Sequence, residues 1–401
     1  MATRTVHGPH DPELLADLER AVHHLASIDR PSASEGETRA ALWIADALRE
    51  LGLDAQVEAE RAHGTYWWPI GLLNAAALWS LRQARRGRRL RALTLAAVAT
   101  AAVVDDLDHR HRWFRRALLP HRPTHNVTAV AGDPQAEHTV VIVAHHDAAH
   151  SGAIFDPALP RWLQARFPDA YDRTIFHPPL LWLTVFGPIL ALLAAARGGS
   201  RAFRAAQVFT VGTILAMADI GRRPAVPGAN DNLTGVATLL GLARRLRDAP
   251  VEGLRVLLVS VGSEESFSEG MAAWGRRHFP ELARDRTWVV AVDTVGSPTL
   301  AIPLSEGFLR AYDYDPGLRR DAIEAAGAHG IELAGDFRFS FATDAQIARH
   351  AGYPTLLLGS VDELRSPANY HWPTDTAENV DYGTVAEAVT VLDGLLRRLS
   401  R

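Results

Sequence analysis

The chain has 401 residues, with 42 basic and 46 acidic side chains and a formal charge of -4. This balance, and the lack of a Lys/Arg run that alternates with aromatic residues, predicts that nucleic acid is not a partner. Because cysteine is absent, disulfides and thiolate metal sites are excluded, and any metal must bind through His, Asp and Glu.

The N-terminal part of the chain predicts two helices and a strand. Residues 12–30 and 35–51 have apolar side chains at helical spacing. Ser34, followed three residues later by Glu37, is the pattern of a capping box at the start of the second helix. After Gly52, the alternating apolar residues of 53–57 predict a strand.

Further along the chain, apolar β-branched segments alternate with helical patterns. The predicted strands are 126–130, 139–144, 254–261, 288–292 and 354–358. The clearest helix between them is 235–247. Strands that alternate with helices predict an α/β fold in which helices sandwich the sheet.

Two long insertions interrupt this single domain of residues 1–401. Residues 62–122 and 152–224 each contain two apolar stretches joined by a basic turn. The stretches are 66–81 and 92–104 in the first insertion, and 178–196 and 205–218 in the second. The turns contain Arg82, Arg85, Arg86, Arg88, Arg89 and Arg91, and then Arg197, Arg201 and Arg204. The sequence therefore predicts two hydrophobic helical hairpins.

Two interpretations of the hairpins compete. A membrane span needs about 20 apolar residues, a length that only 178–196 clearly approaches. The polar residues Asn74, Gln207 and Asp219 favour buried helices that form a lid or an oligomer interface. Trp67, Trp68 and Trp182 beside apolar helices, and two basic turns, favour the membrane. Four apolar helices are also hard to bury in one domain of this size.

We therefore expect a membrane-associated protein that contacts the bilayer through 66–104 and 178–218. The acidic residues Asp11, Glu13 and Asp17 break up the N-terminal region, so a cleavable signal peptide is not expected. The arginine-rich turns prefer the cytoplasm by the positive-inside rule. The opposite flanks also carry arginines, namely Arg110, Arg112, Arg115, Arg116, Arg222 and Arg223, so the sequence leaves the side of the membrane open.

Five short fragments carry the polar residues from which a metal site can be built. They are Ala144-His145-His146-Asp147, Gly228-Ala229-Asn230-Asp231-Asn232, Ser263-Glu264-Glu265, Val292-Asp293 and Tyr370-His371-Trp372-Pro373. Most of them follow a predicted strand, so their polar ends should converge at one edge of the sheet. A catalytic dizinc site needs a carboxylate that bridges the ions, and His and carboxylate ligands on each.

Each fragment alone has an ordinary explanation. Asp231 before a helix is typical of an N-cap, and Glu264-Glu265 is typical of a solvated turn. Adjacent acids at a strand end point in different directions, so one can face a metal and the other the attacking water. His145 and Asp147 are two residues apart and share a side, which makes Asp147 a natural partner for the imidazole. It is the combination that predicts a site.

Together the five fragments resemble the M28 family of zinc aminopeptidases over residues 10–61, 124–151 and 225–400. The resemblance implies a mixed, mostly parallel sheet of the zinc-exopeptidase type, and a peptidase whose substrate is a peptide with a free N-terminus. It implies two zinc ions per chain, with Asp231 as the bridge, His145 and Asp293 at one ion, and Glu265 and His371 at the other. It also implies that Glu264 is the general base, that Asp147 orients His145, and that the Asp231-Asn232 peptide is cis.

The sequence departs from the family pattern at three positions. The family often has Tyr where this chain has His146, and Asp where this chain has Asn232. Neither position is a ligand. Thr343-Asp344-Ala345 stands where the family often has Ser-Asp-His, so a histidine on the substrate side is missing. Substrate preference is therefore less transferable than metal binding.

Two other functions fit the same motifs. Glutaminyl cyclases share the fold and use one zinc ion for acyl transfer. A non-catalytic scaffold with a peptidase fold is a third hypothesis, although such chains often lose ligands and all five are present here.

Overall fold

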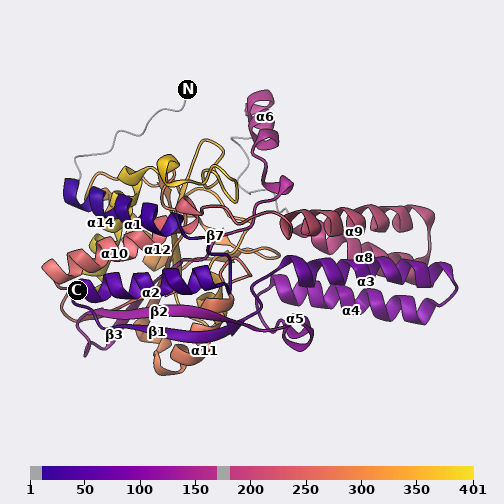
Figure 1. Cartoon of the computed structure of the whole chain (residues 1–401), viewed down its shortest axis with the longest axis horizontal. Helices are drawn as coiled ribbons and strands as arrows, with labels where there is room; N and C mark the ends of the chain where they lie inside the picture. Colours follow the sequence, from indigo (N-terminus) through magenta and orange to yellow (C-terminus); the bar gives the residue numbers. More distant parts are fainter. Residues whose placement is uncertain (1–10, 169–180) are drawn as a thin grey trace.

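The computed structural model describes residues 11–168 and 181–401, in which a seven-stranded sheet forms the centre of the molecule (Figure 1). The strands follow the order β1-β2-β4-β3-β5-β9-β6 across the sheet. Their bounds are β1 Ala55–Ala62, β2 Arg122–Gly132, β3 His138–His145, β4 Leu254–Val261, β5 Thr287–Val292, β6 Thr299–Ala301 and β9 Thr355–Val361. Two short strands, β7 Ser305–Glu306 and β8 Tyr312–Asp313, pair with each other outside it.

The four central strands β4, β3, β5 and β9 run parallel, whereas β1, β2 and β6 are antiparallel to their neighbours. The fold is thus the predicted α/β fold with a mixed, mostly parallel sheet. Parallel strands end at a common edge, which is where ligands bind in open α/β sheets. The topology therefore collects the polar residues that follow β3, β4 and β5.

Helices cover both faces of the sheet because its side chains alternate. In β3, Val140 and Ile142 face one core, and Val141 and Val143 face the other. The first core is covered by α1 Pro12–Ala26, α2 Glu35–Glu50, α10 Thr234–Asp248, α12 Pro316–Gly327 and α14 Tyr382–Leu399. The second is covered by α11 Glu269–His278 and α13 Ala345–His350. Short helical turns are η1 Ala153–Phe155, η2 Ala229–Leu233, η3 Phe279–Glu281, η4 Arg284–Arg286 and η5 Ala377–Asn379.

Several predicted boundaries were wrong by a few residues. The strand predicted at 53–57 is β1, which begins at Ala55 and continues to Ala62 because it pairs with β2 along its whole length. The helix predicted at 12–30 ends at Ala26. Strands β6, β7 and β8 were not predicted, because two or three residues carry no readable alternation.

The capping box at α2 is half formed. The Ser34 side chain accepts a hydrogen bond from the Glu37 backbone N–H at 3.1 Å, as expected. The Glu37 carboxylate does not return to Ser34 but accepts from the Ala33 N–H, from the Thr124 hydroxyl and from the Ser263 N–H. Because Ser263 directly precedes the acidic pair after β4, Glu37 anchors the loop that carries that pair.

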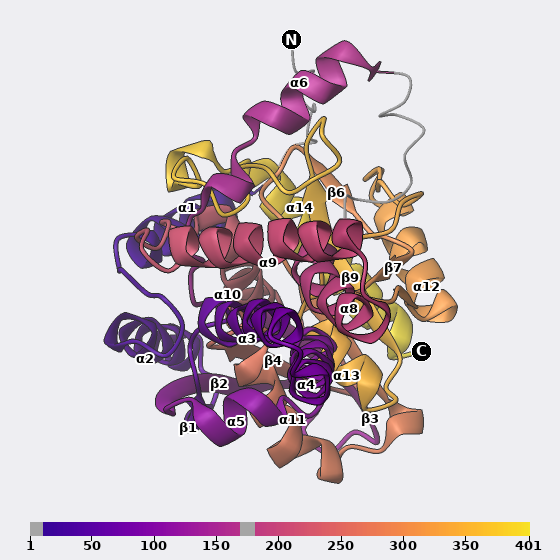
Figure 2. The same cartoon turned by 90° about the vertical axis from the view of Figure 1, so that its right-hand side faces the viewer.

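The two insertions fold into one bundle of four helices that projects from the side of the sheet (Figure 1). The helices are α3 Trp67–Arg85 and α4 Arg89–Leu107 from the first insertion, and α8 Trp182–Arg197 and α9 Ser200–Ile220 from the second. They pack across the two hairpins, α3 on α8 and α9, and α4 on α8. Residues 178–180 of the third predicted stretch lie outside the described residues. Both hairpin turns reach the free end of the bundle, toward the viewer in Figure 2.

Two further helices lie beside the bundle. Helix α5, Trp113–Leu118, follows α4 at the end of the bundle nearest the sheet, and α6, Ala158–Arg166, extends away from the domain (Figure 1). We use the term root for the end of the bundle nearest the sheet, and the term tip for the end with the hairpin turns.

A buried ion-pair network joins the root to the peptide segment after β4. Arg115 of α5 donates two hydrogen bonds of 2.7 Å to the Asp106 carboxylate of α4. It also lies 3.3 Å from Glu269 of α11 and donates to the Ser266 carbonyl. Arg115 and Asp106 are at most 1% exposed. Glu269 in turn accepts from the His63 N–H at the entry to the first insertion.

The network predicts a large loss of stability when its cation is removed. An Arg115→Leu variant leaves the Asp106 and Glu269 carboxylates buried without their shared partner, which costs about 3–5 kcal/mol. The matched control is Arg110→Leu. Arg110 pairs with Asp108, but its side chain is 52% exposed, so the loss of this pair should cost under about 1 kcal/mol. Denaturant unfolding of both variants measures the difference. Equal losses in the two variants would show that the buried network does not stabilise the root.

Candidate metal centre

The carboxyl ends of three central strands bring the predicted residues together. His145 is the last residue of β3, Glu264 and Glu265 follow β4, and Asp293 directly follows β5. Asp231 lies in the turn η2 before α10, and His371 lies in the loop before η5. All six side chains are less than about 15% exposed, so the centre is shielded from bulk water.

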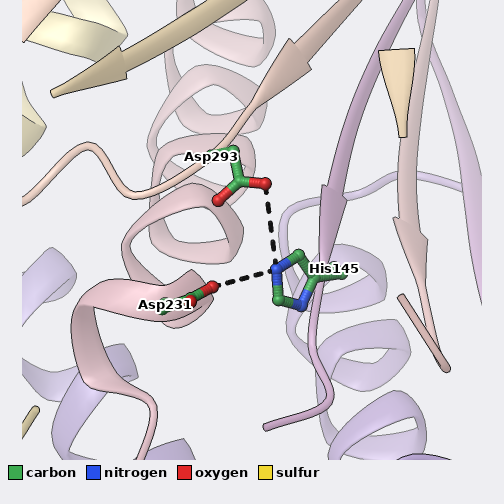
Figure 3. A group of neighbouring side chains, drawn as sticks. All are labelled: His145, Asp231 and Asp293. Carbon is green, nitrogen blue, oxygen red and sulfur yellow. Dashed lines mark ion pairs between the residues drawn. The ribbon is translucent and has the colours of Figure 1, made fainter. Parts of the chain in front are cut away.

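His145, Asp231 and Asp293 form the first group. The His145 Nε2 atom lies 3.2 Å from Asp231 Oδ1 and 3.9 Å from Asp293 Oδ2 (Figure 3). One ligand atom of each residue lies within 4.8 Å of the others. This spacing suits three ligands around one ion of zinc size, whose bonds to N and O are about 2.0–2.2 Å long.

Asp231, Glu265 and His371 form a second group of the same size. The His371 Nε2 atom lies 3.2 Å from Asp231 Oδ2 and 3.2 Å from Glu265 Oε2. Asp231 belongs to both groups and directs a different oxygen to each histidine. This is the arrangement of a carboxylate that bridges two ions.

Glu264 stands beside these groups. Its Oε2 atom is 3.9 Å from His145 Nε2, and its Oε1 accepts a hydrogen bond from the Ser268 hydroxyl. Glu264 also fits a third combination of ligand atoms, with His145 and Glu265. The first two groups use each of the other five residues without it.

The surrounding carboxylates strongly change the titration of the two histidines. Burial acts to lower the pKa of His371, but Glu265 and Asp231 outweigh it and raise this pKa to about 10. Burial also acts to lower the pKa of His145, but Asp147 and Asp231 outweigh it and raise this pKa well above its usual value. In the absence of metal the two histidines therefore tend to hold a proton, and metal binding must displace that proton.

The carboxyl groups are equally perturbed. Burial, together with neighbouring acids, raises the pKa of Glu264 and Asp293 well above their usual values. Burial also raises the pKa of Asp344, at the start of α13, to about 7. Buried acids in this arrangement either bind a proton or need a nearby cation to remain charged.

The residues of this centre fit zinc. The set contains imidazole and carboxylate donors only, which are borderline and hard ligands that zinc accepts. Within the described parts of the chain, Glu265 Oε1 and His371 Nδ1 are buried without a hydrogen-bond partner. Buried polar atoms are normally satisfied, so the unpartnered carboxylate oxygen indicates a ligand at this position.

Asp147 positions residues of both groups, which extends the predicted role of orienting His145. Its Oδ1 atom lies 3.4 Å from His145 Nδ1 and accepts from the Glu264 N–H at 3.0 Å. The other oxygen accepts from the Glu265 N–H and from the Ser32 hydroxyl. A single carboxylate therefore aligns one histidine with the acidic pair.

Arg30 is a positioning residue that sequence analysis missed. It is fully buried and donates from Nε to the His146 carbonyl, and from its two Nη atoms to the carbonyls of Pro227 and Gly228. Its guanidinium thus ties the loop after β3 to the loop before Asp231. Burial lowers the pKa of Arg30 to about 10, so it stays charged at neutral pH. An arginine at the end of a helical pattern gave no sequence signal for this role.

Asp375 and Asn232 also hold the bridging aspartate. The Asp375 carboxylate accepts hydrogen bonds from the backbone N–H groups of Asn230 and Asp231. Asn232 donates to the Val292 carbonyl at 2.8 Å and so joins η2 to the end of β5. The Asp231-Asn232 peptide is cis, as the resemblance implied.

The remaining departures from the family pattern lie outside the metal groups. His146 points away from the centre and shares a hydrogen bond with the Ser260 hydroxyl. Burial lowers its pKa to about 3, so it is neutral. Ala345, the first residue of α13, is fully buried in the second core.

Comparisons with known proteins agree with this fold. Over 99% of both chains, the structure is similar to the glutaminyl cyclase of Fimbriiglobus ruber, with a TM-score of 0.56 and 12% identity. A leucine aminopeptidase precursor from Bacteroides thetaiotaomicron has a TM-score of 0.53 and 13% identity, covering 98% of this chain and 99% of that one. A Zn-dependent exopeptidase from Parabacteroides distasonis has a TM-score of 0.54 and 13% identity, covering 99% and 100%. No curated protein sequence matches the chain significantly.

Fold and ligand set together define a zinc metallopeptidase. Residues 210–394 match the family model described as Peptidase family M28. Over this segment the chain is similar to the M28 peptidases.

The Arg30 contacts predict that a shorter cation will loosen the centre. In Arg30→Lys the charge remains, but one ammonium cannot reach carbonyls of three residues in the geometry of a guanidinium. We expect zinc affinity to fall about 10- to 100-fold, as it does when the residues that orient metal ligands are altered. Competition with a zinc chelator measures this. The control is Arg319→Lys, which loses similar bonds to the Ile302 and Gly335 carbonyls away from the centre; a wild-type affinity in Arg30→Lys would exclude the positioning role.

Proposed function

We propose that the protein is a dizinc aminopeptidase that hydrolyses the N-terminal peptide bond of peptides. The observation that carries the proposal is the position of Asp231, whose two oxygens each lie 3.2 Å from a different histidine. A single-ion site would not need a carboxylate shared between two complete groups of ligands. The second group, with Glu265 and His371, is as compact as the first.

In this proposal His145 and Asp293 would hold one ion, Glu265 and His371 would hold the other, and Asp231 would offer one oxygen to each. When bound, zinc supplies a Lewis acid that polarises the scissile carbonyl and makes water more acidic. Asp147, Arg30 and Asp375 keep the loops in place, so little reorganisation is needed as the charge of the reaction develops.

Glu264 is the proposed general base. It borders His145 but is not needed for either group of ligands, and the Ser268 hydroxyl and the Asp147 contact to its backbone orient it. Its carboxylate removes the proton from the attacking water and delivers a proton to the leaving amine. Ionised carboxylates are needed for the first step, and the positive charge brought by metal lowers the raised pKa of a nearby acid.

A second candidate is acyl transfer of the glutaminyl-cyclase type with one zinc ion. The observation in its favour is the similarity of the fold to glutaminyl cyclases over nearly the full chain. The scaffold hypothesis is less well supported, because all five ligands and Glu264 lie together in the structure.

Metal content and substrate choice distinguish the two enzymatic candidates. We expect about two zinc ions per chain, and hydrolysis of aminoacyl amides that is lost with a chelator and restored by zinc. Elemental analysis of the purified protein, and a panel of aminoacyl and N-terminal glutaminyl substrates, provide the measurement. One zinc per chain with conversion of glutaminyl peptides alone would support the cyclase, and no turnover of any substrate by the zinc-loaded protein would support the scaffold.

Replacement of the proposed base tests the assignment of roles. Glu264→Gln keeps the size of the side chain but removes the proton acceptor, so we expect kcat to fall about 10²- to 10⁴-fold with the zinc content unchanged. The matched variant is Glu265→Gln, which should lose zinc from the second group. If Glu264→Gln also loses zinc, Glu264 is a ligand and the roles of the two acids are reversed.

A further inference from the structure

In the outer part of the four-helix bundle, small side chains are buried and large apolar side chains are exposed, which is the reverse of the packing expected in water. Its outer part, toward the tip, is filled by small side chains. Its buried members are Ala77, Ala96, Ala99, Ala191, Ala194 and Ala206, with Leu81 the one larger side chain. The half-buried Leu78, Leu190, Leu192 and Phe203 pack against them. At Gly187 an added Cβ would lie 2.7 Å from the Thr210 side chain, so α8 and α9 approach closely there. Small residues between helices are typical of bundles in lipid, where burial of large side chains provides no driving force.

Large apolar side chains point outward from all four helices. The exposed ones include Trp68, Leu72 and Trp79 of α3, Leu90, Val98 and Val104 of α4, Leu183, Phe186 and Leu193 of α8, and Val208, Val211 and Leu215 of α9. Val208 is 70% exposed and Leu215 is 64% exposed. A soluble bundle places such residues inside and charged residues outside. The outward face therefore needs an apolar solvent.

Polar groups within the bundle bond to its own backbone. Asn74, fully buried, donates to the carbonyls of Ile70 and Thr184. The hydroxyls of Ser80 and Thr210 donate to carbonyls three and four residues earlier. Of the three polar residues that had favoured a soluble lid, Asn74 thus has its amide N–H groups bonded, Gln207 accepts from Arg85, and Asp219 pairs with Arg223 at the root. Helices in lipid satisfy polar side chains in the same way.

Charge is confined to the ends of the bundle. The middle segments 67–81, 92–104, 182–196 and 205–218 contain no Asp, Glu, Lys, Arg or His. Each is about 20–23 Å long at ~1.5 Å per residue. Among the helices of residues 11–168 and 181–401, α9 alone is long and apolar enough to cross a membrane. The shorter segments can cross a hydrocarbon core of ~30 Å if the long arginines at the tip extend to the headgroups and the bilayer thins locally.

The arginines at the two ends of the bundle differ in their partners. Within residues 11–168 and 181–401, none of the nine turn arginines pairs with a carboxylate. At the root, Arg110 pairs with Asp108, Arg115 with Asp106 and Arg223 with Asp219, whereas Arg112, Arg116 and Arg222 have no such pair among the described residues. Nine unpaired arginines at the tip against three at the root place more unpaired positive charge at the tip. Arg82 and Arg85 also stack on Trp79 and Phe203, which is typical of side chains at a membrane interface.

We propose that the bundle spans a phospholipid bilayer, with the arginine turns on the cytoplasmic side and the peptidase domain on the opposite side. The root then lies at the outer headgroups. Trp68 and Trp113, which are 58% and 43% exposed, supply the aromatic residues of that interface.

This placement brings the metal centre close to the membrane surface. Phe155, in the first turn of the second insertion, packs edge-on against the His371 ring at 4.6 Å between centroids. Trp67 at the start of α3 contacts His150, three residues after Asp147, at 4.6 Å. The bundle thus begins beside the site. The peptides cleaved are those whose N-terminus lies near the outer membrane surface.

Single cysteines can test the topology directly, because the chain has none of its own. Arg86→Cys and Ser200→Cys report on the two turns, and Asp285→Cys reports on the peptidase domain; all three positions are exposed. In intact spheroplasts, a membrane-impermeant maleimide should label only Asp285→Cys, and permeabilisation should add the two turn positions. Labelling of all three positions before permeabilisation would overturn the spanning bundle. Labelling of the turns alone would overturn the orientation.

A matched pair of substitutions tests whether lipid is the solvent of the outward face. Leu215→Lys places a charge on the bundle surface, and Ile323→Lys places one at a 40% exposed position of α12 on the peptidase domain. We expect Leu215→Lys to lower the carbonate-resistant membrane fraction several-fold and Ile323→Lys to leave it unchanged. If the wild-type chain is soluble without detergent, or if Leu215→Lys only raises the yield of soluble protein, the bundle is a soluble lid or an interface with a second copy.

Discussion

Concentration of negative charge at the edge of the sheet is the constraint on which the rest of this structure depends. Asp231, Glu264, Glu265 and Asp293 are held within a few ångströms of two histidines and away from water. Such a group is unfavourable without compensating cations. The loops that carry these residues are held in place by Asp147, which accepts from the Glu264 and Glu265 N–H groups, and by Arg30, which donates to the His146 and Gly228 carbonyls.

Hydrogen bonds connect the loops that form the metal centre to one another. Glu37, Asp147 and Asp375 each accept hydrogen bonds from backbone groups of a segment distant in sequence. Glu269 extends this pattern to the bundle root through Arg115. The metal centre and the bundle are therefore parts of one connected scaffold, although the insertions contribute no ligand.

The ligands could be recognised from the sequence because each has a local signature. A polar residue that follows an apolar strand, as His145, Glu265 and Asp293 do, must lie at the strand end in a parallel sheet. The residues that hold the ligands could not be recognised in this way. Arg30 and Glu37 lie in or beside N-terminal helices, and each bonds to a loop of the centre that is more than a hundred residues away. Only the packing of α1 and α2 on the sheet brings them to the site.

The composition of the insertions was enough to predict that they are apolar. The spacing of apolar residues was enough to predict the sheet and its helices. Periodicity determines which face of each strand or helix is apolar, since local sterics and burial act on nearby residues. What the tertiary structure decided is how segments far apart combine: that two hairpins form one bundle, that its small residues face inward, and that Asp231 lies between two histidines. These relations depend on long-range packing, which no local pattern encodes.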